Sequence, residues 1–184
     1  MENFDSTNTP ISNKKKILSV VLVAFIIVLI IKTFVVEGLV VNGESMSPTI
    51  SSGDYIFINK LAYIWTAPKR GDIVVVRPRV NVGSVVKRIV GMPGERLQIL
   101  DGIVTVREDR NSTSTPLDEV YLNGLTTKEI GTTYIQLDPF EYFVFGDDRE
   151  VSIDSRELGP VDIYNIKGKP FLIFNTKNFS FRLI

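Results

Sequence analysis

The chain has 184 residues, with 21 basic and 21 acidic side chains, no histidine and no cysteine. The missing histidine excludes a Ser-His-Asp triad and His-ligated metals, and the missing cysteine excludes thiol nucleophiles, disulfides and thiolate zinc sites. A formal net charge of zero argues against broad electrostatic binding of nucleic acid. A general base in this chain must therefore be a lysine, a carboxylate or a tyrosine.

The first predicted element is an apolar helix over residues 17–36. Its first fifteen residues hold Ser19 as the only polar member, and continuing to Val36 gives twenty residues, enough to cross a hydrocarbon core of about 30 Å. Lys32 lies near the end and can extend to the headgroups. Because the run has no polar face, it is unlike a core helix, and we expect a transmembrane anchor.

Three consecutive lysines, Lys14 to Lys16, precede this run. Positive charge marks the cytoplasmic side, so we expect 1–16 to be a cytoplasmic tail and 37–184 to lie outside. Residues 1–13 are polar and are predicted to be disordered. No small-x-small cleavage site follows in 34–37, so we expect the anchor to be retained rather than cleaved as a signal peptide.

Beyond residue 37, short β-branched and aromatic runs alternate with Gly, Pro and Asp turn signals, which predicts a mainly β domain. Asp101-Gly102 is a hairpin signal, and a secondary β region is expected at about 98–140. The polar stretch 108–115 is predicted to be an exposed loop. The predicted strands are Leu39–Val41, Tyr55–Asn59, Ile73–Arg77, Val85–Val90, Arg96–Leu100, Ile103–Arg107, Thr133–Leu137, Tyr142–Phe145 and Pro170–Asn175.

Of three local motif matches, two do not hold and the third is less favoured than its alternative. Residues 43–47 approach a Gly-x-Ser-x-Gly elbow, but the last glycine and a histidine are missing. Ser84 and Lys87 match Ser-x-x-Lys, but on a predicted strand their side chains point to opposite faces. The acidic residues in 147–154 are interleaved with arginines and do not have EF-hand spacing, so a salt-bridged turn is favoured over a metal site.

The remaining chemical candidates are Ser45 and Lys87. A lysine acts as a base only when neutral, and burial among the valines and isoleucines around Lys87 lowers its pKa from about 10.4. Taken singly, Lys87 is more often a strand lysine that reaches water, and Ser45 a turn serine.

The joint pattern resembles the type I (leader) signal peptidases of bacteria. The anchor and four segments follow in order, and the resemblance covers about 17–175. The segments are Ser45-Met46-Ser47-Pro48-Thr49, Arg70 to Val75, Lys87 to Glu95, and Gly146 to Arg156 with its Ser152, Asp154 and Arg156.

The resemblance implies a mainly β fold: a single N-terminal transmembrane helix followed by a signal-peptidase-like β-sheet catalytic domain with a smaller β insert. It implies a membrane-bound serine endopeptidase without a cofactor or metal, with Ser45 as nucleophile and Lys87 as general base. Its expected partners are the lipid bilayer and preproteins with small residues at −1 and −3, and not nucleic acid. The expected localisation is the cell membrane, with a single span, a cytoplasmic N-terminus and an extracytoplasmic catalytic domain.

The resemblance also assigns residues around this pair. Ser152 is expected to orient the lysine amine. Asp154 and Arg156 fall on a structural ion pair, and Asp147 and Arg149 are expected to belong to the same network, although an exposed charged turn is an open alternative for these two.

Two positions depart from the family pattern. The Ser45 N–H is the expected oxyanion donor, and a second donor is in doubt because Gly43 stands where many members carry a hydroxyl. Asp148 stands where the family usually has Asn, and an added carboxylate would raise the lysine pKa. We expect Asp148 to point away from the amine or to pair with Arg149 or Arg88.

Apolar residues beside the pair in sequence are expected to form shallow substrate pockets, with Val85 favoured over Val86 because it shares a strand face with Lys87. Ile64, Trp65 and Phe57 are candidates for lipid contact, with a core role as the alternative. The expected pocket residues are Leu39, Val41, Met46, Ile50, Val85 and Val86.

Two other functions remain open. Self-cleaving SOS repressors share a Ser/Lys fold but have no membrane span, and histidine-dependent signal peptidases are excluded by composition. A non-catalytic homologue serving in assembly would be expected to lose Ser45 or Lys87, and both are present.

Overall fold

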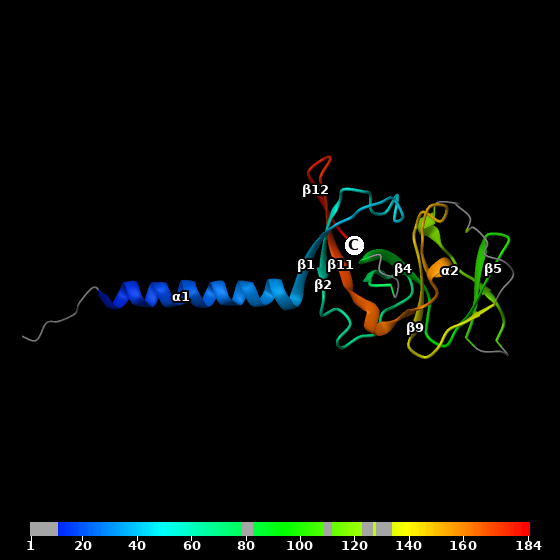
Figure 1. Cartoon of the computed structure of the whole chain (residues 1–184), viewed down its shortest axis with the longest axis horizontal. Coiled ribbons are helices and arrows are strands. Elements are labelled where there is room, and N and C mark those ends of the chain that lie inside the picture. The colour runs from blue at the N-terminus through cyan, green and yellow to red at the C-terminus, as the bar shows by residue number, and fades with distance from the viewer. Residues whose placement is uncertain (1–10, 79–82, 109–111, 123–126, 128–133) are drawn as a thin grey trace, which may run out of the picture. The chain divides into compact units, whose positions relative to one another are not determined.

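The protein was analysed as a computed structural model that describes residues 11–78, 83–108, 112–122, 127 and 134–184. The chain forms two compact units, Met1–Val36 and Glu37–Ile184. In the first unit, helix α1 (Ile11–Ile30) continues into the π-helical turn η1 (Ile31–Val35) (Figure 1). Residues Asn13–Val35 are long and apolar enough to cross a membrane.

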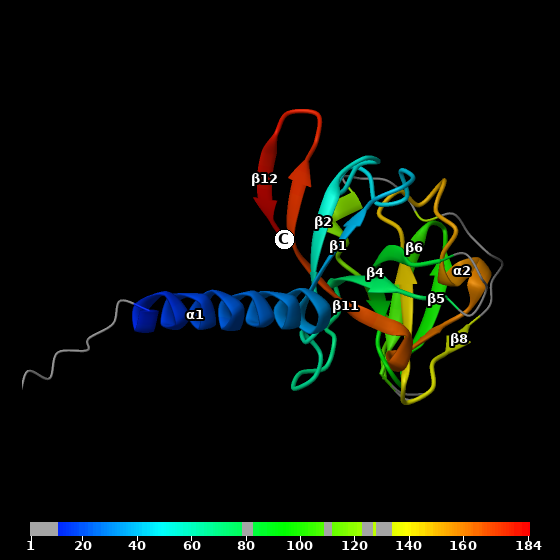
Figure 2. The same ribbon diagram turned by 60° about the vertical axis from the view of Figure 1, so that its left-hand side comes forward.

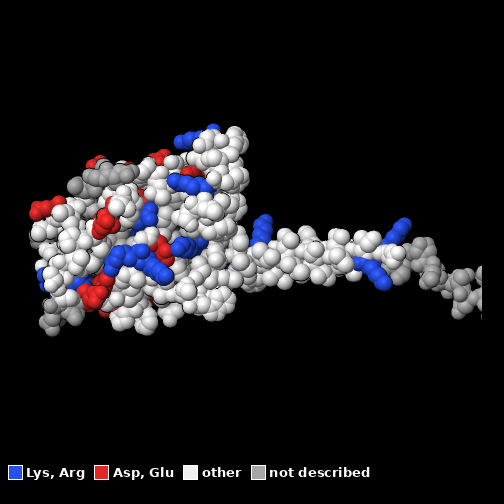
Figure 3. Space-filling view, turned by 180° about the vertical axis from the view of Figure 1, so that it is seen from behind, with Lys and Arg blue, Asp and Glu red and all other residues white. Residues whose placement is uncertain are grey.

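Figure 3 shows that charged side chains lie near the two ends of the helical segment formed by α1 and η1, with none along its middle. The helix begins at Ile11, so the disorder predicted for residues 11–13 is wrong. Pro10 precedes this start, and proline is tolerated where helices begin because its missing N–H is not needed there. The rest of the predicted tail lies outside the described residues.

The second unit is mainly β, which confirms the predicted fold class (Figure 1). Three short helices, η2 (Val120–Leu122), α2 (Ser155–Leu158) and η3 (Ile163–Asn165), connect its strands. The strands are β1 (Val36–Val40), β2 (Tyr55–Asn59), β3 (Ile73–Val76), β4 (Val85–Gly91), β5 (Arg96–Leu100), β6 (Ile103–Arg107), β7 (Thr115–Pro116), β8 (Ile135–Gln136), β9 (Glu141–Phe145), β10 (Val161–Asp162), β11 (Ile166–Asn175) and β12 (Ser180–Leu183).

The larger sheet has eight strands in the order β1-β2-β11-β3-β4-β9-β10, with β12 paired to β11 (Figure 2). Its central strand β3 is buried at all four positions. Ile73 and Val75 pack into one apolar cluster with Ile56 and Ile173, whereas Val74 and Val76 pack into another. Both faces of the sheet are therefore covered, which explains why β3 reads as a continuous apolar run.

The smaller sheet has four strands in the order β7-β6-β5-β8. Asp101 and Gly102 both have positive φ, 51° and 76°, and connect the paired residues Leu100 and Ile103. Positive φ at both turn positions is the requirement of the predicted Asp-Gly hairpin. The buried residues of β5 and β6 join Phe143 and Phe145 of β9 in a third apolar cluster, so the two sheets share a core.

The strand predictions differ from the structure mainly at short or interrupted strands. β7 and β10 have only two residues each, and β12 is four exposed residues, so pairing rather than periodicity defines them. β11 begins at Ile166 instead of Pro170, because the chain passes Gly168 and a register shift after Pro170 without leaving the sheet. β1 runs from Val36 to Val40 rather than Leu39–Val41.

Candidate active site

Ser45 lies in a tight loop between β1 and β2. The Ser47 N–H donates to the Glu44 carbonyl at 2.8 Å, and the Ile50 N–H donates to the Met46 carbonyl at 2.8 Å. Met46 and Ile50 are buried at 1% and 0% exposure, so the loop is held down by apolar side chains on both sides of the half-buried serine. The local sequence thus presents Ser45 from a rigid turn.

Lys87 extends from β4 toward this loop. Its Nζ lies 2.9 Å from Ser45 Oγ and 3.0 Å from Ser152 Oγ, and the residue is only 3% exposed. Its cross-strand partner on β3 is the fully buried Val74. A small cavity beside Lys87 is lined largely by apolar side chains, among them Val144.

The electrostatic environment lowers the pKa of Lys87 from 10.5 to about 8. Burial is the largest cause, because the ammonium loses its hydration. Asp154 and Asp147 favour the charged amine and raise the pKa, whereas Arg156 lowers it. The net result is an amine that is partly neutral near neutral pH, as a proton acceptor requires.

The segment 146–156 closes over both residues. The Asp148 N–H donates to the Ser45 carbonyl at 3.1 Å, and the Ser152 N–H donates to the Asp148 carbonyl at 3.2 Å. A Cβ added at Gly146 would collide with Ser152 Oγ and with the Ser45 carbonyl. Only glycine therefore lets this segment approach the serine loop so closely.

Two bidentate ion pairs brace the segment. Arg156 binds Asp154 through Nε–Oδ1 at 2.8 Å and Nη2–Oδ2 at 2.9 Å, and Arg88 binds Asp147 through Nε–Oδ1 at 2.7 Å and Nη2–Oδ2 at 2.6 Å. Burial alone would raise the pKa of the Asp154 carboxyl, but its bonds from Arg156 and from the Gly146 N–H hold that pKa below its usual value. These carboxylates are therefore occupied by arginine.

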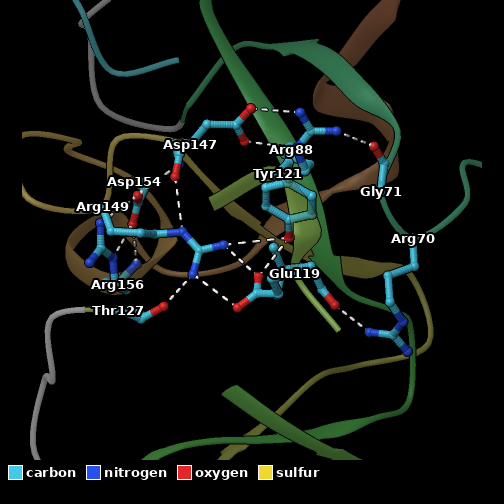
Figure 4. A network of polar contacts seen from close by, with 12 residues as sticks. Arg70, Gly71, Arg88, Glu119, Tyr121, Thr127, Asp147, Arg149, Asp154 and Arg156 are labelled. Carbon is cyan, nitrogen blue, oxygen red and sulfur yellow. Dashed lines mark hydrogen bonds and ion pairs between the residues drawn. The ribbon is translucent and has the colours of Figure 1, made fainter. Parts of the chain in front are cut away.

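Arg149 binds partners that the sequence did not predict. Its side chain is fully buried; its Nε donates to the Gly146 carbonyl at 3.0 Å, and its guanidinium binds Glu119 and Thr127 (Figure 4). Sequence reasoning missed Glu119 and Thr127, because both lie in the region 98–140 and only the tertiary fold brings them to the site.

Asp148 points its carboxylate into its own turn. Oδ1 accepts the Glu150 N–H at 3.2 Å, while Arg88 and Arg149 bind other carboxylates. Asp148 is also not among the charges that shift the pKa of Lys87. The first of the two expected arrangements, a side chain directed away from the amine, is the one that the structure shows.

A pocket opens beside Ser45 between β1 and the start of β4. Val85 and Val86 both line it, but Val86 is the one that packs with Leu39, Val41 and Met46, so strand-face alternation does not favour Val85. Ile50 is absent from this lining and packs in the core beneath it. The residues lining the pocket are Leu39, Val40, Val41, Asn42, Ser45, Met46, Ser84, Val85 and Val86.

Gly43 is the position at which a second oxyanion donor is in doubt. It has no side chain, its φ is +101°, and its N–H donates to Ser52 Oγ at 3.2 Å. The glycine is explained by its left-handed backbone, which a side chain would strain.

A family comparison identifies the class of the protein. Residues 14–175 match the model of the family described as "Signal peptidase, peptidase S26". The chain belongs to this signal peptidase family, and it is a peptidase by class. The resemblance seen in the sequence is thereby confirmed.

Two relatives of known class agree with this assignment. The chain is 32% identical to signal peptidase I P of Bacillus subtilis subsp. natto, over 93% of this chain and 94% of the relative. It is 32% identical to signal peptidase IB of Staphylococcus aureus strain COL, over 90% of this chain and 100% of the relative. A solved signal peptidase I of Enterococcus faecalis V583 has 28% identity and a TM-score of 0.45, over 56% of this chain and 97% of that structure.

Proposed function

We propose that this protein is a membrane-anchored serine endopeptidase that removes N-terminal signal peptides from exported preproteins, with Ser45 as nucleophile and Lys87 as general base. The observation that carries the proposal is the buried Lys87 amine, 2.9 Å from Ser45 Oγ, in a chain of the signal peptidase family. Among the described residues, Lys87 is the side chain that is hydrogen-bonded to the Ser45 hydroxyl and could therefore accept its proton.

In the proposed reaction, the neutral Lys87 amine accepts the Ser45 proton as Oγ attacks the scissile carbonyl. The resulting ammonium then gives the proton to the leaving amine, and the acyl group stays on Oγ as an ester. A water that is deprotonated by the same amine releases the signal peptide. Ser152 Oγ, 3.0 Å from Nζ, keeps the amine aligned through both steps.

The charge that develops on the carbonyl oxygen requires a donor, and the Ser45 N–H is the proposed one. The pocket beside Ser45 offers apolar side chains from Leu39, Val41 and Met46 against which a small substrate side chain can pack. β1 lies at the end of the strand order, which leaves an edge against which an extended substrate can pair. These features support preproteins with small residues at −1 and −3 as substrates.

The apolar helix over Asn13–Val35 supports a membrane anchor with the lysines of 14–16 on the cytoplasmic side. Ile64 and Trp65 are 58% and 83% exposed and are therefore available for lipid contact, whereas Phe57 is half-buried in β2. An anchored enzyme and an anchored signal sequence share one membrane, which raises the effective concentration of the cleavage site.

Cleavage of a preprotein by the full chain in detergent tests the chemistry. Ser45→Ala and Lys87→Ala should each lower the rate about a thousandfold or more. Ser47→Ala in the same loop and Lys177→Ala on the surface are matched controls that should cleave normally, with mass spectrometry locating the cut. Cleavage that survives both of the first two changes would refute the dyad, and a wild type without any cleavage would favour a non-catalytic homologue.

The absence of cysteine makes the topology simple to test. Single cysteines replacing Asp5 and the exposed Lys177 are treated in intact cells with a membrane-impermeant maleimide. We expect labelling at position 177 alone. Labelling at position 5 alone would reverse the proposed orientation.

A further inference from the structure

In the region between β6 and β9, the short turn of Glu119, Val120 and Tyr121 lies next to the active site. Glu119 binds the Arg149 guanidinium through both carboxylate oxygens, and the Tyr121 hydroxyl donates to Glu119 Oε1 at 2.6 Å. The Tyr121 ring lies 4.1 Å from the Arg88 guanidinium carbon (Figure 4). A single turn therefore contacts two arginines that come from different strands and loops.

Each of these arginines binds or belongs to a segment that holds Ser45 or Lys87. Arg149 donates to the Gly146 carbonyl, and Gly146 lies at the start of the segment whose N–H at residue 148 holds the Ser45 carbonyl. Arg88 is the neighbour of Lys87 on β4 and binds Asp147 with both ends of its fork. The contacts thus connect the turn to the serine loop on one side and to the lysine strand on the other.

The charges show why Glu119 matters. The Arg149 side chain has 0% exposure, and Glu119 is its one carboxylate partner among the described residues. A buried cation without a carboxylate partner is strongly unfavourable, so loss of the Glu119 carboxylate should weaken the placement of Arg149. Cation–π contacts with Phe145, at 4.5 Å, and Tyr121, at 5.9 Å, complete the enclosure.

We propose that Glu119 and Tyr121 are positioning residues for the Ser45–Lys87 pair, so that the smaller β region acts as a support which keeps the segment 146–152 closed over the amine. The inference rests on the proposed function. It assigns this region a role in catalysis without any contact to substrate. The groups facing Lys87 remain Ser45, Ser152, Asp154, Asp147 and Arg156. The turn acts through the segment 146–152, which carries Asp147 and Ser152 and is followed directly by Asp154 and Arg156.

Loosening this segment should expose the lysine amine to water. The kcat should then fall, while KM stays nearly constant, because the pocket is lined by residues 39–42, 45, 46 and 84–86, whereas the turn contacts Arg149 and Arg88. The pH midpoint of kcat should also move upward, toward the ordinary lysine value, as desolvation is relieved. Loss of folded protein alone would scale the rate without moving the midpoint.

The test compares Glu119→Gln, Tyr121→Phe and Arg149→Gln with Asp118→Asn, which removes a neighbouring exposed carboxylate as the matched control. Rates are normalised to the folded fraction from circular dichroism. We expect Glu119→Gln to lower kcat about tenfold, with Tyr121→Phe weaker, since neighbours in one network are coupled. Glu119→Asp keeps the charge, so its kcat and its pH midpoint should both lie closer to the wild-type values than those of Glu119→Gln.

A double variant separates a coupled pair from two independent effects. Glu119→Gln combined with Arg149→Gln should be no slower than Arg149→Gln alone, because the buried cation that Glu119 neutralises is already gone. The inference would be overturned if the double variant lowered kcat by the product of the two single reductions, or if Glu119→Gln left both kcat and its pH midpoint unchanged. Either result would leave the proposed function intact. An inactive wild type would overturn both.

Discussion

The pKa of Lys87, about 8, gives the proposed mechanism a measurable pH dependence. At that pKa the neutral fraction of the amine is about 1% at pH 6, about 9% at pH 7 and about 90% at pH 9. A lysine with its ordinary pKa would be only about 0.03% neutral at pH 7. The chain holds no histidine, so no imidazole titrates in the same range. We therefore expect the cleavage rate to rise about tenfold from pH 7 to pH 9, with a midpoint near 8.

The assay is single-turnover cleavage of a peptide with alanine at −1 and −3, with the full chain in detergent micelles, from pH 6 to pH 10. Circular dichroism at each pH shows that the fold is intact, and single-turnover conditions remove product release from the rate. The reasoning would fail if the profile were flat between pH 6 and 9, or if the rate were still rising tenfold for each pH unit at pH 10.

Four substitutions test other parts of the site. Lys87→Met should stabilise the protein at pH 7 by up to about 3 kcal/mol, because the lysine pKa falls from 10.5 unfolded to about 8 folded; chemical denaturation should show the gain in full below pH 8 and its loss above pH 10.5. Ser152→Ala should lower kcat about tenfold without abolishing cleavage, as expected for a group that aligns the base, and a complete loss in steady-state assays would make the hydroxyl essential. Gly146→Ala should inactivate the enzyme and lower its melting temperature, since its Cβ would strike Ser152 Oγ and the Ser45 carbonyl. Asp148→Asn should change the rate at pH 7 by less than about tenfold, because its carboxylate faces its own turn; a larger rise would mean that this charge reaches the amine.

The sequence predicted the structure well wherever the residues of a single helix, strand or turn determine its conformation. The Asp101-Gly102 hairpin, the β2, β5 and β6 boundaries and the apolar helix all follow from periodicity or turn chemistry within a few residues. The predictions were weaker where a strand is defined only by its pairing with a neighbouring strand. The two-residue strands β7 and β10 are examples, since they are too short to show an alternation of apolar and polar residues. The helix start at Ile11 was missed because polar composition outweighed its continuity with the apolar run.

By itself, the sequence determined the family, the mainly β class and the identity of Ser45 and Lys87 as candidates, because these depend on residue types in a fixed order. The tertiary structure decided which side chains surround them. The burial of Lys87, which lowers its pKa, and the partners of Arg149 both arise from segments far apart in the chain. Desolvation and ion pairing depend on distance in space, and only the folded chain sets those distances.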